Sequence, residues 1–321
     1  MKLTLAKRRA GSGMISLLFT CLANAQSTYP ERPIKLIVPF PAGGSIDTIA
    51  RLLAEQMHKD LKVPIIVDNK AGATGLIGAQ SVVRAPADGY TVLMTTSALT
   101  IAPWMTHTDF KLEKLTAVTE LVKTPYVIVV NENSEYKTID QFIDYAKRHP
   151  NKLTCSTYGV GSPPHIALEL FKKAADVQIT HVPYKGFTQA LPDLVSRRID
   201  CAVHTEVDVE PHIRKGSLRA IANTSDAPMS LLKDTVPLAA RWPEIKVEGW
   251  QGIFVPAGTP QEMVQKLHET FTTIVKQTQM TERLRALGFI AVANEQSEFE
   301  QRFQSEYRRY GSVLKEIDPA N

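Results

Sequence analysis

The chain has 321 residues and a formal net charge of +4. The first 25 residues contain four basic residues and no acidic one, so the 33 basic residues that remain equal the 33 acidic residues. A chain without net charge beyond its N-terminal segment has no electrostatic basis for binding nucleic acid or an anionic membrane surface. The length is enough for a large hydrophobic core and is more typical of two domains than of one.

The first 25 residues have the pattern of a secretory signal peptide. Their basic residues precede a short apolar run at 14–22, and Ala23-Asn24-Ala25 follows as a small-residue cleavage site. We therefore predict cleavage after Ala25 and a mature chain that works outside the cytoplasm. Cys21 suggests the alternative of a lipid-anchored protein, but Phe19 and Thr20 are larger than the residues that such signals prefer.

Strands and helices alternate along most of the mature chain, which predicts an α/β fold with a parallel sheet and helices on both of its faces. Hydrophobic patterning and turn residues define the expected elements. Strands are expected at 34–38, 64–67, 91–94, 126–130, 153–156, 179–182, 200–203, 218–222 and 251–255, helices at 46–61, 76–84, 139–148, 165–174, 188–196, 261–277, 280–287 and 296–316, and a loop at 226–245.

Two glycine-containing turns, at 40–45 and 157–162, each connect a strand to a helix. Such a turn directs free backbone N–H groups and the positive end of a helix dipole toward one point, which suits a small carboxylate. We expect Ser45 to cap the first of these helices. Asp47 lies in the first helical turn, and we expect it to organise the loop through backbone N–H groups and not to touch the anion.

Cys155 and Cys201 are the cysteines that remain after the signal peptide. Outside the cytoplasm they could form a disulfide. The sequence also fits two small buried thiols on strands, and we favour this interpretation because sequence separation says nothing about the distance between the two side chains.

Other chemistry is poorly supported by the sequence. The segment Gly72–Gly78 resembles a nucleotide-binding glycine pattern, but the preceding strand ends too early and no acidic residue ends the next strand. The segment 43–47 lacks the last glycine of a hydrolase nucleophile turn. The histidines are scattered, without the spacing of metal ligands. We therefore expect neither an enzyme nor a bound cofactor or metal.

Several motifs in order resemble the Bug-type extracytoplasmic solute-binding proteins, the receptors of tripartite tricarboxylate transporters. The resemblance covers about residues 29–290. Its motifs are Tyr29-Pro30 with Arg32-Pro33-Ile34, Ile37-Val38-Pro39-Phe40-Pro41 with Gly43-Gly44-Ser45 and Asp47, Asp88-Gly89-Tyr90-Thr91, Gly161-Ser162 with Pro164-His165, His181-Val182-Pro183-Tyr184-Lys185-Gly186, and Pro256-Ala257-Gly258-Thr259-Pro260.

The resemblance implies a two-lobed, type II-like periplasmic binding protein fold, with two parallel-rich sheets flanked by helices and a ligand cleft between the lobes. Lobe one would comprise 26–127 and 251–321, and lobe two 128–250, with chain crossings near 127–131 and 248–252. A monomer would capture a di-, tri- or aromatic carboxylate in the periplasm for two membrane transporter subunits. A secreted carboxylate-binding sensory module that feeds a signalling receptor is the alternative.

The same resemblance places the ligand against the two glycine-containing turns. Amino-acid-binding members carry an aspartate after the strand at 200–203, where this chain has His204-Thr205-Glu206, so we expect a ligand without an amine. His204 could donate a hydrogen bond to such a ligand or could pack against a neighbouring helix. The candidate ligand-binding residues are Phe40, Ala42, Gly43, Gly44, Ser45, Asp47, Thr96, Ser97, Thr157, Tyr158, Gly159, Gly161, Ser162, His165, Tyr184 and His204.

Overall fold

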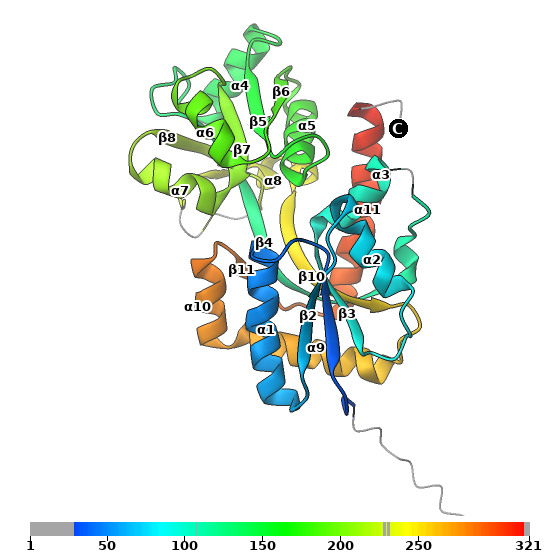
Figure 1. Cartoon of the computed structure of the whole chain (residues 1–321). Helices are drawn as coiled ribbons and strands as arrows, with labels where there is room; N and C mark the ends of the chain where they lie inside the picture. The colour runs from blue at the N-terminus through cyan, green and yellow to red at the C-terminus, as the bar shows by residue number, and fades with distance from the viewer. Residues whose placement is uncertain (1–28, 107, 227–228, 230–231, 318–321) are drawn as a thin grey trace, which may run out of the picture.

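The computed structural model describes residues 29–106, 108–226, 229 and 232–317. The expected signal peptide, its cleavage site and Cys21 lie outside these residues. Figure 1 shows two α/β halves, which we call the lower half and the upper half after their places in that view. Two long strands, β4 and β10, run between them.

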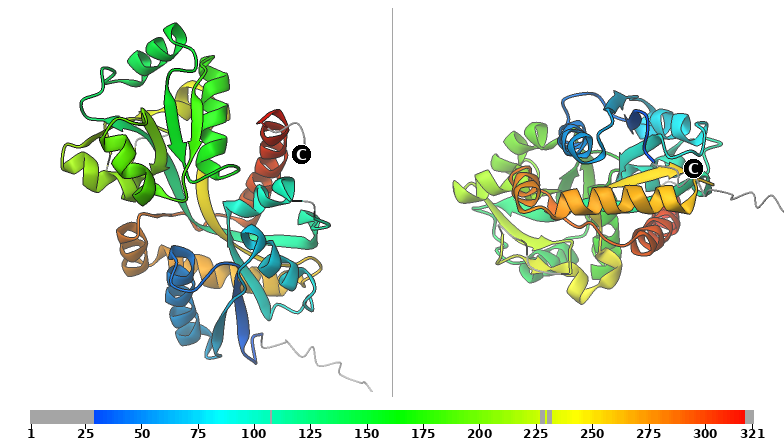
Figure 2. Two further views of the ribbon diagram at one scale, coloured as in Figure 1. Left: turned by 45° about the horizontal axis from the view of Figure 1, so that its top comes forward. Right: turned by 90° about the horizontal axis from the view of Figure 1, so that it is seen from below.

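The lower half is built on a βαβαβ unit, as the sequence predicts. Strands β2, β1 and β3 pair in parallel, and β10 joins β3 in the antiparallel direction. Helix α9 lies along the underside of this half (Figure 2), where its apolar face packs against the strands in one core. The elements are β1 Ile34–Val38, α1 Ser45–Leu61, β2 Ile65–Asn69, α2 Leu76–Val83, β3 Thr91–Thr96, α9 Gln261–Lys276, α10 Thr278–Ala286 and β11 Ile290–Ala291.

Strand β4, Leu115–Asn131, is the longest strand among the described residues and connects the two halves. Residues 115–125 pair with β10, Glu248–Pro256, whereas 126–131 pair with β7 and β8. The sequence predicts a strand at 126–130 and misses its first eleven residues. The resulting ladder runs β2-β1-β3-β10-β4-β7-β5-β6, so the halves are joined through the backbone hydrogen bonds of one strand.

The upper half repeats the alternation of strands and helices. Strands β7, β5 and β6 are parallel to one another, and β8 pairs with the opposite edge of β4. Helix α7 contains Pro211 and is not predicted by the sequence. The elements are α4 Ile139–Arg148, β5 Thr154–Thr157, α5 Pro163–Ala175, β6 Thr180–Pro183, α6 Phe187–Val195, β7 Cys201–Thr205, α7 Glu206–Arg214, β8 Leu218–Asn223, β9 Val236–Pro237 and α8 Leu238–Arg241.

The last helix, α11 Gln296–Ile317, contacts both halves. Phe299 and Phe303 pack with Trp250 in a core of the lower half. Further along the helix, Tyr310 and Leu314 belong to the main core of the upper half. The remaining short helices are η1 Ala73–Gly75, η2 Ser97–Thr100, α3 Ala102–Met105, η3 Leu112–Lys114 and η4 Pro243–Ile245.

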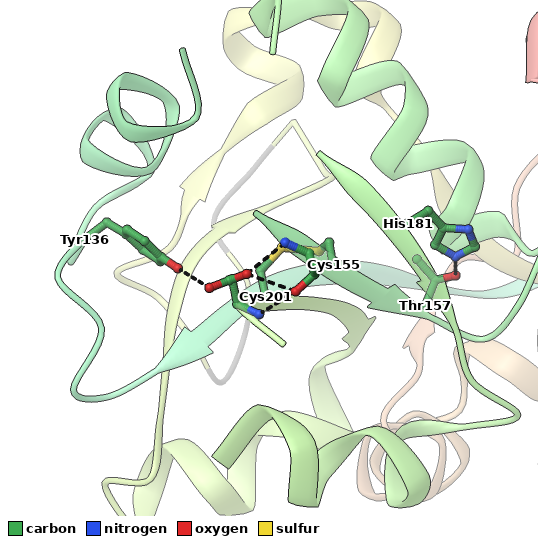
Figure 3. The surroundings of a disulfide bond; sticks show 7 residues. Tyr136, Cys155, Thr157, His181 and Cys201 are labelled. Atoms are coloured by element: carbon green, nitrogen blue, oxygen red, sulfur yellow. Dashed lines mark hydrogen bonds between the residues drawn. A yellow bond between two sulfur atoms is a disulfide. The ribbon is translucent and has the colours of Figure 1, made fainter. Parts of the chain in front are cut away.

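Cys155 and Cys201 form a disulfide, so our preference for two separate thiols is wrong. The two residues lie opposite each other on the paired strands β5 and β7, with their Cα atoms 4.5 Å apart. Figure 3 shows the bond inside the upper half, beside a network in which Asp200 accepts hydrogen bonds from Tyr136 and Thr154. Strand register, which the sequence does not reveal, brings the sulfur atoms together.

Removing this disulfide should destabilise the protein. The two cysteines are 46 residues apart. Closing a loop of that size lowers the conformational entropy of the unfolded chain, which stabilises the folded protein by about 4 kcal/mol. The double variant Cys155→Ala/Cys201→Ala should therefore unfold roughly 10 °C below the oxidised protein. Circular dichroism melts of both proteins check this, and equal melting temperatures would contradict it.

Candidate ligand-binding site

A cavity of about 570 Å³ lies between the two halves. The lower half contributes Ser45 and the segment 96–98, and the upper half contributes the segment 185–188 together with side chains from β7 and α7. Residues 249–251 of β10 form part of its wall where that strand passes between the halves. Because both halves supply its walls, their relative position determines the shape of this cavity.

The first glycine-containing turn presents Ser45 to the cavity in a way that the sequence does not predict. Gly44 is the N-cap of α1, and Ser45 is its first helical residue. No side chain caps this helix, so our expectation that Ser45 is the cap is wrong. The Ser45 side chain lines the cavity at the positive end of the helix dipole.

Asp47 organises the turn as expected. Its carboxylate accepts the Gly43 N–H at 2.9 Å, the Asn69 amide at 3.0 Å and the Arg51 guanidinium at 2.9 Å. These bonds, above all the one from Arg51, lower the pKa of Asp47 to about 2. Asp47 is buried and does not line the cavity. The Gly43 N–H is therefore engaged by the protein itself.

The second glycine-containing turn is also held together by internal hydrogen bonds. Ser162 is the N-cap of α5, accepts the His165 N–H at 3.4 Å and donates its hydroxyl to Gly159 O at 2.7 Å. The Gly161 N–H donates to His165 Nδ1 at 3.0 Å. Met105 of the lower half covers Gly161 so closely that a Cβ atom there would lie 3.0 Å from its sulfur.

Tyr158, Thr205 and Asp208 form a hydrogen-bonded cluster on the cavity wall. Tyr158 donates its hydroxyl to Asp208 Oδ2, and Thr205 donates its hydroxyl to the same oxygen at 2.7 Å. Burial, followed by the nearby Asp208 carboxylate, raises the pKa of Tyr158 well above its usual value. Tyr158 is a candidate from the sequence, whereas Thr205 and Asp208 were not identified.

Lys185 is the cation of this cavity. It is the one basic side chain among the described residues that line the cavity, and none of the ion pairs formed by the described residues involves it. It was not among our candidates, although it lies in a motif that carries the family resemblance. Its neighbour Tyr184 donates its hydroxyl to Asp193 at 2.7 Å and does not line the cavity.

His204 lies behind the cavity wall. It is fully buried, and its ring packs against the rings of Tyr158 and Phe187, with centroids 4.5 and 4.9 Å away. Burial lowers the pKa of His204 to about 4, so the ring is neutral at physiological pH. His204 thus packs against its neighbours, which is the second of the two alternatives that the sequence left open. Tyr158 and Phe187, which contact its ring, line the cavity.

The structure brings four of the sixteen candidates to this cavity, namely Ser45, Thr96, Ser97 and Tyr158. The other twelve support or flank the two turns, or lie behind the wall. They are Phe40, Ala42, Gly43, Gly44, Asp47, Thr157, Gly159, Gly161, Ser162, His165, Tyr184 and His204.

Within the described ranges there is no group of three side chains suited to hold a metal ion, and no described helix is long and apolar enough to span a membrane.

Two α/β halves joined by crossing strands around a central cavity define the periplasmic solute-binding protein fold. The sequence matches the family described as Tripartite tricarboxylate transporter family receptor over residues 49–318. The chain belongs to this family.

Relatives and solved structures agree with this assignment. The UPF0065 protein in the tcbD-tcbE intergenic region of Pseudomonas sp. (strain P51) is 31% identical, over 97% of this chain and 95% of that protein. A TctC solute binding protein from Polaromonas has a TM-score of 0.83 and 27% identity, over 90% of this chain and 99% of that chain. A Rhodopseudomonas palustris protein solved with adipate has a TM-score of 0.72 and 28% identity, over 89% and 97%.

Proposed function

We propose that this protein captures a small organic carboxylate in the cavity between its halves and delivers it to a tripartite transporter with two membrane subunits. The observation that carries the proposal is the cavity itself, which combines the N-terminus of α1 at Ser45 with the cation of Lys185. Adipate in a solved structure of similar fold supports a carboxylate ligand. The protein would act as a monomer, without catalysis, after cleavage behind Ala25.

We further propose that 26–127 with 251–321 move as one lobe and 128–250 as the other. The support is the change of partners along β4, which pairs with β10 up to Pro125 and with β7 and β8 from Tyr126 onward. Bending at this point would close the cavity around a ligand. Closure would also bring the two glycine-containing turns nearer to the bound carboxylate, which keeps their residues as candidate contacts.

The expected affinity requires several hydrogen bonds. A micromolar ligand needs about 8 kcal/mol, whereas the end of one helix dipole supplies at most about 2 kcal/mol. Hydrogen bonds that involve a charged group contribute about 1.5–3 kcal/mol each. Lys185 and the hydroxyls of Ser45, Thr96 and Ser97 are among the groups in the cavity that can donate such bonds to a carboxylate.

Native mass spectrometry of the purified protein, followed by a thermal-shift series of mono-, di- and tricarboxylates, tests the proposal. A specific ligand at a hundred times its Kd should raise the melting temperature by roughly 5–10 °C. The methyl ester of that ligand is the matched control and should have no effect. Trp250 lines the cavity and donates its indole N–H to Glu306 at 2.7 Å, so its fluorescence should change with ligand binding. Equal shifts with acid and ester would overturn the proposal.

A further inference from the structure

On one wall of the cavity, the hydroxyl groups of Tyr158 and Thr205 already donate their protons to a neighbouring protein group. The Tyr158 and Thr205 hydroxyls both donate to Asp208 Oδ2, and the Thr205 N–H donates to the Tyr158 oxygen at 3.2 Å. A hydroxyl has one proton to donate and an ionised carboxylate has none. The cluster of Tyr158, Thr205 and Asp208 therefore presents lone pairs to the cavity.

The carboxylate of Asp208 can accept further hydrogen bonds. A carboxylate can accept about four hydrogen bonds, and the two hydroxyls of the cluster both reach Oδ2. Asp208 is only partly buried and lines the cavity. A ligand group can therefore approach its other oxygen directly.

Gln251 adds a second acceptor from β10. Its side chain is 3% exposed and lines the same cavity, and no described residue donates a hydrogen bond to its amide oxygen. An acceptor left without a donor in a closed, dry site would cost free energy. The cavity thus has hydrogen-bond acceptors at Asp208 and Gln251 in addition to the donors at Lys185 and Ser45.

We propose that the ligand carries a hydrogen-bond donor, a hydroxyl or an ammonium group, next to its carboxylate, and that Asp208 is the specificity-determining residue that accepts it. This inference rests on the proposed function. A carboxylate without such a donor would bring a second negative charge toward Asp208 and leave its lone pairs unpaired. Asp208 lies four residues beyond His204, so the absence of an aspartate at 204–206 does not exclude an amine on the ligand.

Calorimetric titration with two series of probes tests the inference. Succinate, malate and aspartate form one series, and phenylpropanoate, phenyllactate and phenylalanine form the other. Within each series the three members carry hydrogen, hydroxyl and ammonium at the same carbon. We expect at least one series to bind, with a substituted member roughly tenfold or more tighter than the unsubstituted one. If none of the six binds, the proposed carboxylate capture fails. If the unsubstituted acid binds equally well, only the present inference fails.

The variant Asp208→Asn separates recognition from structural support. Asparagine keeps one acceptor oxygen but loses the charge, so an ammonium ligand should lose more than tenfold in affinity and a hydroxyl ligand less. The unsubstituted acid should bind with unchanged or higher affinity. Asp144→Asn, on the exposed face of α4, is the matched control. Unchanged affinity of the substituted ligands for Asp208→Asn would overturn the inference, as would an equal loss for all three members of a series.

Discussion

The variant Arg302→Met is expected to lower the free energy of unfolding by about 3–5 kcal/mol at pH 8, because it leaves buried carboxylates without their cation. Arg302 lies on α11 and binds Glu120 at 2.7 Å and Glu306 at 2.9 Å, and it lies 3.6 Å from Glu248. All three carboxylates are buried. Lys123, 3.0 Å from Glu248, is the other cation of this group. Chemical denaturation of both proteins measures the loss.

The pH dependence of stability tests whether unpaired buried carboxylates cause the loss in the Arg302→Met variant. Burial raises the pKa of Glu120 to about 7, from a usual value of 4.5. The folded state therefore takes up a proton at Glu120 between these values, and the contribution of Glu120 to the stability of the wild-type protein falls as the pH rises through this window. Arg302 lowers the pKa of Glu120, so without Arg302 this carboxyl group ionises less readily, and the variant should lose more stability at pH 8 than at pH 5.

Arg308→Met is the matched control, because Arg308 is exposed on the same helix. It should change stability by less than about 0.5 kcal/mol. Adding Glu120→Gln to Arg302→Met removes one of the unpaired charges and should restore part of the loss. A loss below about 1 kcal/mol for Arg302→Met at both pH values would show that the cluster does not stabilise the fold.

Replacing Lys185 with methionine should weaken carboxylate binding by about 10- to 150-fold, which corresponds to one charged hydrogen bond of 1.5–3 kcal/mol. Lys185 is the one basic side chain that the described residues place on the cavity wall. The remaining donors there, which include hydroxyls, backbone N–H groups and the Gln251 amide, are neutral. The affinity of the wild-type protein should also fall with rising salt concentration, and that of the variant should fall less.

Lys147→Met gives the matched control, since Lys147 is exposed on α4 and outside the cavity lining. Calorimetry of the three proteins with the same carboxylate at two salt concentrations checks the prediction. The Lys147 variant should bind like the wild-type protein. If the Lys185 variant does so as well, the ligand carboxylate does not reach this side of the cavity.

The alternation of strands and helices is visible in the sequence because each element buries one apolar face, yet the first part of β4 is not. Residues 115–125 include Glu120, Lys123 and Pro125, which are unusual in the interior of a strand. Arg302 compensates the Glu120 charge from α11, 182 residues further along the chain. Sequence patterns are local, so they cannot reveal a strand that depends on so distant a partner.

Helix α7 and the disulfide were missed for related reasons. Pro211 usually interrupts a helix, but α7 accommodates it within nine residues. The pairing of Cys155 with Cys201 depends on the register of β5 and β7. A register is set by tertiary packing, so neither cysteine carries a local signal of its partner.

The sequence identifies the two glycine-containing turns and four of the residues that line the cavity, but not Lys185, Thr205, Asp208 or Gln251. The glycine-containing turns are visible because glycine and serine mark a helix N-terminus. For His204 the sequence left ligand contact and packing as alternatives, because it stands where amino-acid-binding relatives carry an aspartate; in the structure its ring is buried against Tyr158 and Phe187. Asp208 did have a signal: Thr205 followed three residues later by an acid resembles a capping box and predicts a helix start whose acid points back toward the strand end.

The position of α11 has a consequence for the order in which the protein can assemble. This helix completes the apolar cores of both halves through Phe299 and Phe303 on one side and Tyr310 and Leu314 on the other. It is also the last of the described helices along the chain. A chain that lacks these 22 residues leaves apolar surface open in each half, so we expect neither half to reach its full packing before α11 is in place.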